Sequence, residues 1–211
     1  MRIGLILGLM LWAVGLQAAE RGLQSVDSKH VKVWNEFADK LLVLHKQVIS
    51  SHEVKETTRL GNYRKDPPFY KEHTYHDAKT GSLLTRVQWE IANPKNVHVL
   101  ELFLYDDKDR LARDYTVAFL PGFRNAPSQT VVTLYNYNGK LKAFRNFDAN
   151  GETTYESCDG DLNGKYVQLS FEDYEIEGLR TNKNGVGGSA EYKACFDAIP
   201  LAADKVLPPR L

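Results

Sequence analysis

Apolar and polar residues alternate with a period of two along most of the chain after residue 53. In the segment 83–91, Val87 and Trp89 fall on one face and Arg86 and Gln88 on the other, which is typical of a strand with one wet side. The segment 97–105 is apolar on both sides, which favours a central strand. The pattern predicts strands near residues 53–60, 69–77, 83–91, 97–105, 110–120, 129–137, 140–147, 152–157, 165–177 and 188–197.

One short motif recurs between these strands: an aromatic residue, Asp or Asn, two more residues, a turn residue and a charged residue. It occupies residues 105–110, 135–140 and 147–152. Gly, Asn and Asp tolerate the positive φ of tight turns, so each copy predicts a β-hairpin. Over about six residues per copy, the motif resembles the Tyr-Asp repeats of large secreted shell-forming proteins, which also implies hairpins. In the strand 165–177 the apolar phase changes after Phe171, and we interpret this change as a bulge.

A helical period of three to four residues appears only near the beginning of the chain. Trp34, Phe37, Leu41 and Leu44 lie on one stripe of a helix expected at about residues 28–50. The stripe needs a sheet to cover it. We therefore expect an α+β fold in which one N-terminal amphipathic helix packs on a long, curled antiparallel meander over about 53–197, as an open half-barrel or cone-like sheet. A closed barrel and a sandwich are the alternatives.

The first residues are typical of a secretory signal peptide. Arg2 precedes an apolar run, and small residues follow at Ala18 and Ala19. The run is too short for a membrane span, which needs about 20 apolar residues. We expect a signal peptide at 1–19, a single soluble domain at 20–211 with no transmembrane segment after cleavage, and a C-terminal surface strap at 198–211. The expected location is periplasmic or secreted.

Charge and cysteine content narrow the classes of function. The chain has 27 basic and 27 acidic residues, so it lacks the basic surface that nucleic-acid binding requires. Two cysteines in an exported chain predict one disulfide, Cys158–Cys195. On the chain-entropy model, such a bridge stabilises the fold by about 3 to 4 kcal/mol.

The string Asp159, Asp161 and Asn163, followed by Gly164, matches the start of a calcium-binding loop. Calcium is therefore the one cofactor for which the sequence offers a candidate site. The acidic twelfth position of such a loop is replaced by Ser170, which favours a polar hairpin turn instead. His73 and His76 stand three positions apart, which places them on opposite faces of a strand and disfavours a metal site.

A proline-bounded loop places Arg124 between Phe123 and Asn125. The planar guanidinium suits a carboxylate or phosphate ligand, so these three residues form a candidate binding loop. The alternative is a salt bridge from Arg124 to a neighbouring hairpin.

No nucleophile elbow, phosphate loop, zinc helix or dinucleotide motif is present. The acidic pair Glu175 and Glu177 is better explained by a solvated strand face than by glycoside hydrolysis. We expect a non-catalytic accessory protein of the cell envelope that contacts a partner protein through its hairpin surface. One alternative is a carrier for a small apolar ligand in the concave sheet, and another is an enzyme whose site is assembled from distant residues. The carrier alternative places five aromatic residues on inward positions: Trp89, Phe103, Tyr105, Tyr115 and Phe119.

Overall fold

The computed structural model describes residues 28–62, 67–121, 124–182 and 184–203. The predicted signal peptide at 1–19 and the last part of the predicted strap, residues 204–211, lie outside these ranges. Within them, one sheet contains nine strands, each hydrogen-bonded to the strands next to it in sequence. The strands are β1 (Val54–Gly61), β2 (Tyr70–Asp77), β3 (Leu83–Glu90), β4 (Val97–Tyr105), β5 (Leu111–Ala118), β6 (Gln129–Asn138), β7 (Leu141–Phe147), β8 (Thr153–Leu162) and β9 (Lys165–Glu172).

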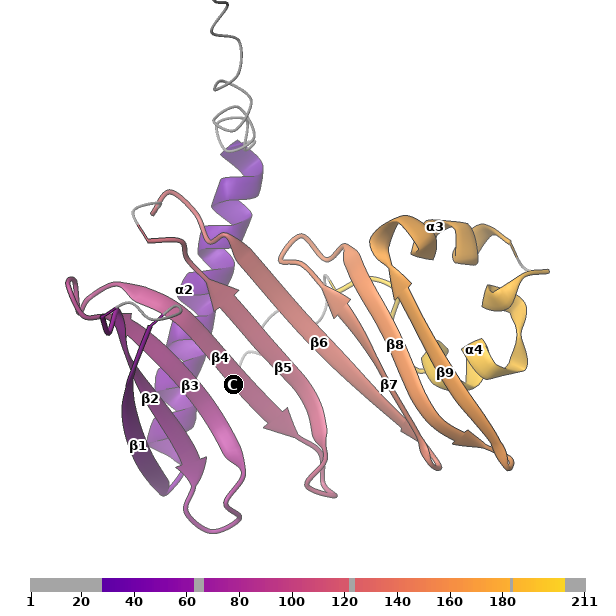
Figure 1. Cartoon of the computed structure of the whole chain (residues 1–211), viewed down its shortest axis with the longest axis horizontal. Helices are drawn as coiled ribbons and strands as arrows, with labels where there is room; N and C mark the ends of the chain where they lie inside the picture. The colour runs from indigo at the N-terminus through magenta and orange to yellow at the C-terminus, as the bar shows by residue number, and fades with distance from the viewer. Residues whose placement is uncertain (1–27, 63–66, 122–123, 183, 204–211) are drawn as a thin grey trace, which may run out of the picture.

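The predicted meander is confirmed for β1 to β9, and every pair of neighbouring strands is antiparallel. The sheet is open, because β1 and β9 pair with no other described strand on their outer sides. Neither the closed barrel nor the sandwich is therefore correct. Figure 1 shows the strands as one layer with the helix α2 (Ser28–Ser51) crossing behind it.

Helix α2 forms where the periodicity predicts it and buries one stripe. Phe37, Leu41 and Leu44 are almost fully buried against the sheet. They pack on the face that carries Leu100 and Leu102. Burying a leucine side chain contributes about 2 kcal/mol, so this stripe alone is a large stabilising contribution. We name the covered side of the sheet the helix face and the opposite side the open face.

The three predicted hairpins are confirmed, and their shared acidic position has a physical reason. Asp106 Oδ1 accepts hydrogen bonds from the backbone N–H groups two and four residues later, both at 2.9 Å. Asp148 Oδ1 makes the same two bonds at 2.9 and 3.0 Å. In the middle copy, Gly139 has a φ of 60°, a region that favours glycine. A carboxylate thus replaces backbone partners inside two of the turns.

The prediction that strands continue to residue 197 is wrong. Strand β9 ends at Glu172, where helix α3 (Asp173–Thr181) begins with a capping box between Glu172 and Glu175. The change of apolar phase after Phe171 is therefore a change from strand to helical period and not a bulge. The predicted last strand is instead the short helix η1 (Val186–Gly188) and helix α4 (Ala190–Phe196).

Helix α4 forms because its sequence supplies both a cap and an apolar stripe. Ser189 accepts a hydrogen bond from the backbone N–H of Tyr192 at the helix start. Tyr192, Cys195 and Phe196 are buried together at helical spacing. The predicted disulfide is confirmed and joins Cys158 on β8 to Cys195 on this helix, with a Cα separation of 6.0 Å. It therefore fixes α4 to the helix face.

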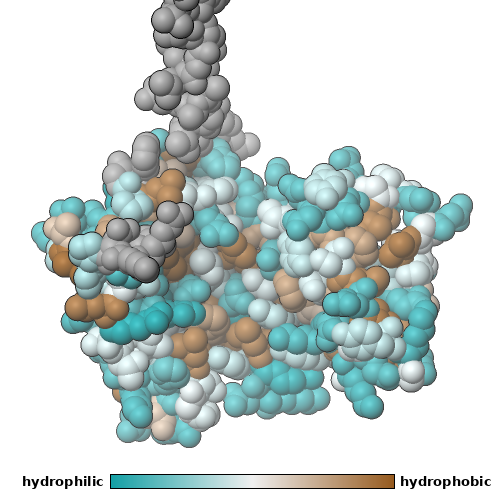
Figure 2. Space-filling view, viewed as in Figure 1, coloured by the Kyte–Doolittle hydropathy of each residue, from teal (hydrophilic) through white to brown (hydrophobic). Residues whose placement is uncertain are grey.

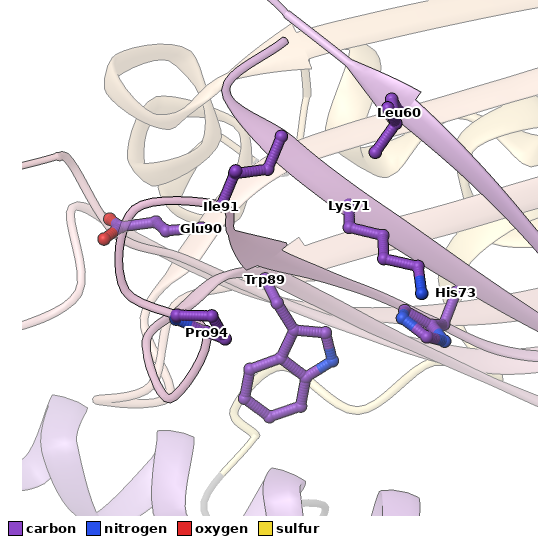
Figure 3. Close-up of a pocket in the computed structure, with 7 residues that line it drawn as sticks. All are labelled: Leu60, Lys71, His73, Trp89, Glu90, Ile91 and Pro94. Atoms are coloured by element: carbon purple, nitrogen blue, oxygen red, sulfur yellow. The ribbon is translucent and has the colours of Figure 1, made fainter.

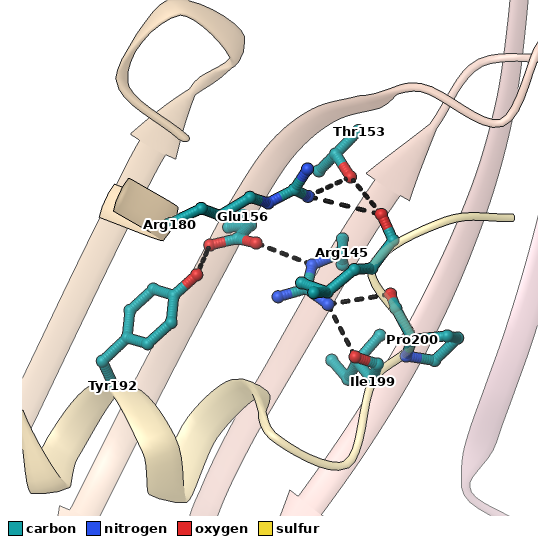
Figure 4. A network of polar contacts seen from close by, with 8 residues as sticks. Arg145, Thr153, Glu156, Arg180, Tyr192, Ile199 and Pro200 are labelled. Atoms are coloured by element: carbon teal, nitrogen blue, oxygen red, sulfur yellow. Dashed lines mark hydrogen bonds and ion pairs between the residues drawn. The ribbon is translucent and has the colours of Figure 1, made fainter. Parts of the chain in front are cut away.

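A buried polar network also holds the segment after α4 (Figure 4). Arg145 on β7 is 1% exposed and donates to Glu156 Oε1 at 2.6 Å. It also donates to the carbonyls of Ile199 and Pro200 at 2.6 and 2.8 Å. Tyr192 donates to the second Glu156 oxygen, and burial together with this carboxylate raises the pKa of Tyr192 to about 12. Both Glu156 oxygens, and Nε and Nη1 of Arg145, thus have protein partners, as a buried charge requires.

Candidate functional site

Arg124 lies in a partly buried ion pair. Its guanidinium contacts Glu90, which is 5% exposed, and donates to the carbonyl of Val97 at 2.6 Å. The carbonyl of Asn125 accepts a hydrogen bond from Asn35 on α2 at 2.7 Å. Phe123 lies outside the described residues. These contacts attach the loop to α2 on one side and to the β3–β4 connection on the other. A ligand role for Phe123, Arg124 and Asn125 stays a prediction.

The calcium-like string forms the β8–β9 hairpin. Asp159 on the open face accepts a hydrogen bond from the hydroxyl of Tyr166, and Asp161 accepts one from the backbone N–H of Gly164 at 2.9 Å. Asn163 has a φ of 56°, which is a turn conformation that asparagine tolerates. The carboxylates of Asp159 and Asp161 therefore both accept hydrogen bonds from within this hairpin. A calcium role for this string stays a prediction.

The remaining acidic and histidine side chains considered as sites lie on different elements of the fold. The pair Glu175 and Glu177 lies on α3 and not on a strand face, which corrects the sequence interpretation. His98 is 3% exposed and stacks on Tyr70 with ring centroids 6.0 Å apart. Among the described residues, no three His, Cys, Asp or Glu side chains form a group that could hold a metal ion.

A cavity of about 470 Å³ opens on the helix face beside α2, at the β1–β3 end of the sheet. We name it the β1–β3 cavity. Its walls come from three neighbouring strands and the loop after β3, as Figure 3 shows. The residues that line it are Leu60, Lys71, His73, Trp89, Glu90, Ile91 and Pro94.

Cross-strand pairing explains how distant residues meet in this cavity. Leu60 pairs with Lys71, and Lys71 pairs with Trp89, so the three form one row across β1, β2 and β3. Residues paired directly across antiparallel strands project from the same face. His73 follows Lys71 by two positions on β2 and shares that face. The floor of the cavity is therefore a row of apolar and basic side chains.

The apolar walls are only partly covered. Leu60 is 62% exposed and Ile91 is 42% exposed, whereas Trp89 is half-buried. Large apolar side chains that stay open together in a concavity are a frequent sign of a binding site. The volume lies within the range of about 300 to 1,000 Å³ of small-molecule pockets.

Two of the three ionisable side chains that line the cavity, Lys71 and His73, are basic residues. The Glu90 carboxylate turns away from it toward Arg124 (Figure 3). His73 Nδ1 lies 2.5 Å from Glu56 Oε1. Because a carboxylate only accepts, Nδ1 donates, which leaves Nε2 for another partner. Lys71 forms no ion pair with any residue in the described part of the chain.

The structure corrects the predicted set of inward aromatic residues. Trp89 lines the β1–β3 cavity, as expected. Tyr115 is fully buried beneath α2, with its ring 6.4 Å from that of Phe37. Phe103 and Tyr105 lie on the open face, one position out of phase with Leu102 and Leu104. Sequence reasoning missed Leu60 and Lys71, because their neighbours become visible only once the register is known.

No protein-family model matches the chain, and no curated protein and no solved structure matches it either. Among the described residues, no helix is both long and apolar enough to cross a membrane. The function must therefore be inferred from the geometry of the molecule.

Proposed function

We propose that this protein is an exported, non-catalytic binding protein that carries a small ligand in the β1–β3 cavity. The observation that supports the proposal best is the row Leu60, Lys71 and Trp89. It places exposed apolar surface in the same concavity as a cation that forms no ion pair with the described residues. The proposed export agrees with the apolar N-terminal run and with the Cys158–Cys195 disulfide.

The ligand that suits these walls has an apolar body and an acidic head group. Trp89, Leu60 and Ile91 offer apolar surface, and burying it favours binding by about 25 cal/mol per Å². Lys71 supplies a cation at the edge of that surface, and its methylene groups extend the apolar floor. A long-chain carboxylate combines both features. We also propose that the sheet is curved as a half-barrel, as expected from the sequence.

The proposal can be tested with fatty acids of increasing chain length added to the mature protein, with tryptophan fluorescence as the readout. Trp89 lines the cavity, so its emission should shift when an apolar chain replaces water beside the indole. A fatty alcohol of the same length should bind about fivefold more weakly. This factor corresponds to the contribution of about 1 kcal/mol that a partly exposed ion pair makes.

Two variants separate the two parts of the site. Lys71→Met keeps the apolar stem and removes the charge, so it should weaken the acid to the affinity of the alcohol and leave the alcohol unchanged. Lys79→Met, in the exposed β2–β3 turn, is the matched control and should have no effect. The proposal fails if no member of the series binds, or if Lys71→Met and the wild type bind the acid equally.

Contact with a partner protein through the hairpin surface, as expected from the sequence, stays a prediction.

A further inference from the structure

The open face carries a row of aromatic side chains that the proposed cavity does not use. Tyr135 on β6 pairs directly with Phe144 on β7, and their ring centroids lie 5.8 Å apart. Phe144 in turn lies 5.8 Å from the ring of Tyr155 on β8. We name these three residues the aromatic strip. No described helix lies over β6, β7 and β8 on this face (Figure 1).

The two tyrosines of the strip are held along the sheet by their hydroxyl groups. The Tyr135 hydroxyl donates to Asp114 on β5 at 2.8 Å. The Tyr155 hydroxyl lies 2.6 Å from Ser170 Oγ on β9. Each ring therefore reaches across the neighbouring strand, with its polar end already bonded. All three side chains of the strip remain half-buried, so each of them keeps some surface open to a ligand on this face.

The surroundings of the strip are polar, and their charges balance. Lys142 Nζ lies 5.3 Å from the centre of the Tyr135 ring, and Asp159 stands directly opposite Lys142 in the register of β7 and β8. Asp114 adds a second carboxylate next to Tyr135. Figure 2 shows this face as mainly hydrophilic and intermediate residues with scattered hydrophobic ones. A polyanion would find no net positive charge here, and an apolar protein surface would find no continuous patch.

We propose that the aromatic strip binds an extended, neutral polysaccharide of the β-1,4-linked class. One side of a pyranose ring is a layer of C–H groups, and these groups are attracted to the electron-rich face of an aromatic ring. The Phe144 ring is tilted by 48° to the Tyr135 ring and by 38° to the Tyr155 ring, so each ring offers a separate contact surface. A β-1,4-linked chain is extended, so successive sugars can contact successive rings across the strands. Short polar side chains beside the strip, such as Ser157, are placed to bond the sugar hydroxyls.

The test uses insoluble chitin and cellulose for co-sedimentation, and their soluble hexasaccharides for titration calorimetry. We expect the wild type to bind at least one of the two polymers. Phe144→Ala should reduce the affinity at least tenfold, because Phe144 is the central ring and makes no polar bond. Tyr174→Ala, which removes a tyrosine that is 78% exposed on α3, is the matched control and should bind like the wild type.

Three further measurements keep the proposal falsifiable. Phe144→Leu keeps most of the side-chain volume without the aromatic face, so it should lose binding as Phe144→Ala does even if the alanine variant folds poorly. Binding should persist in 0.5 M salt, since no ion pair is involved. Fatty-acid binding in the β1–β3 cavity should be unchanged in the Phe144 variants, because that cavity lies on the opposite face. Absence of binding to both polymers, wild-type binding by Phe144→Leu, or a steep loss of binding with salt would each overturn the proposal.

Discussion

Acid should weaken the attachment of α2 to the sheet through one buried histidine. His45 is 4% exposed, and its Nδ1 lies 2.9 Å from Thr85 Oγ1. Because the Thr85 hydroxyl donates to the carbonyl of Glu101, it accepts from His45, which assigns the proton of the neutral ring to Nδ1. The other side of the ring packs against Tyr75, with centroids 5.6 Å apart. No carboxylate in the described part of the chain forms an ion pair with His45, so a charged imidazolium would lack a counterion here.

Burial, with a smaller contribution from Lys46, lowers the pKa of His45 from 6.5 to about 4. Above pH 6.5 the ring is neutral in both the folded and the unfolded protein, and the full stability is present. As the pH falls from 6.5 toward 4, the unfolded chain takes up a proton that the folded protein does not bind. At about 1.4 kcal/mol per tenfold change in proton affinity, about 3 kcal/mol of stability is lost over this interval.

The perturbation that isolates this contribution is His45→Asn, which keeps a donor near Thr85 and cannot be protonated. At pH 7.5 the variant should be less stable than the wild type by about 2 kcal/mol, because the smaller side chain leaves space in the core. At pH 4 the wild type has lost about 3 kcal/mol that the variant retains. The order of stability should therefore reverse, and the plots of the free energy of unfolding against pH for the two proteins should cross at about pH 5.

Urea unfolding at a series of pH values, followed by tryptophan fluorescence, measures the free energy of unfolding of each protein. The carboxylates are common to both proteins, so their contributions cancel in the difference. Leu41→Ala is the control, since it destabilises the same helix without changing a titrating group, and its curve should run parallel to that of the wild type. A constant difference between His45→Asn and the wild type from pH 7.5 to pH 4 would refute the reasoning.

Three further substitutions test how the fold is held together. Leu41→Ala removes a side chain that is 0% exposed and should cost about 3 kcal/mol in the free energy of urea unfolding. Arg145→Ala leaves Glu156 charged and fully buried, so it should lower the free energy of unfolding by about 3 to 5 kcal/mol. An unchanged thermal midpoint would show that this network does not stabilise the fold. Arg124→Ala should cost about 2 kcal/mol by leaving Glu90 unpaired, and Arg124→Ala combined with Glu90→Gln should recover more than half of that loss. An Arg124→Ala protein with wild-type stability would show that this ion pair does not stabilise the fold.

The parts of the fold that could be predicted from the sequence depend on local chemistry. Asp106 and Asp148 mark hairpins because their carboxylates bond the turn backbone within four residues. The apolar residues of the 97–105 segment occupy both phases of a two-residue period, which predicts a strand covered on both faces, and this segment is β4. Helix α2 is long enough for its period to be evident, so the expected end at about residue 50 lies within one residue of the observed end at Ser51.

Short helices, and the choice of which sheet face is covered, depend on residues that are far apart in the sequence. Helix α4 has only seven residues, and over so short a span its apolar positions also fit a strand. The sequence could place Leu102 and Phe103 on opposite faces but could not tell which face α2 covers, since both are apolar. The β1–β3 cavity depends on pairing between Leu60, Lys71 and Trp89, which are separated in the sequence by a turn and a loop.

The cavity follows from the size of the sheet relative to its helices. Strands lie about 4.8 Å apart, so nine of them span about 38 Å, whereas a helix with its side chains is about 10 Å wide. Helix α2 packs on the strands from β3 to β6, and α4 packs on β6 and β7. Two helices of this width cannot also cover the whole of β1 and β2, so Leu60 stays 62% exposed on the helix face. A chain that is exposed to water gains stability by covering such a surface. We therefore expect the fatty acids that bind beside Trp89 to raise the free energy of unfolding, in proportion to the logarithm of their concentration above the dissociation constant.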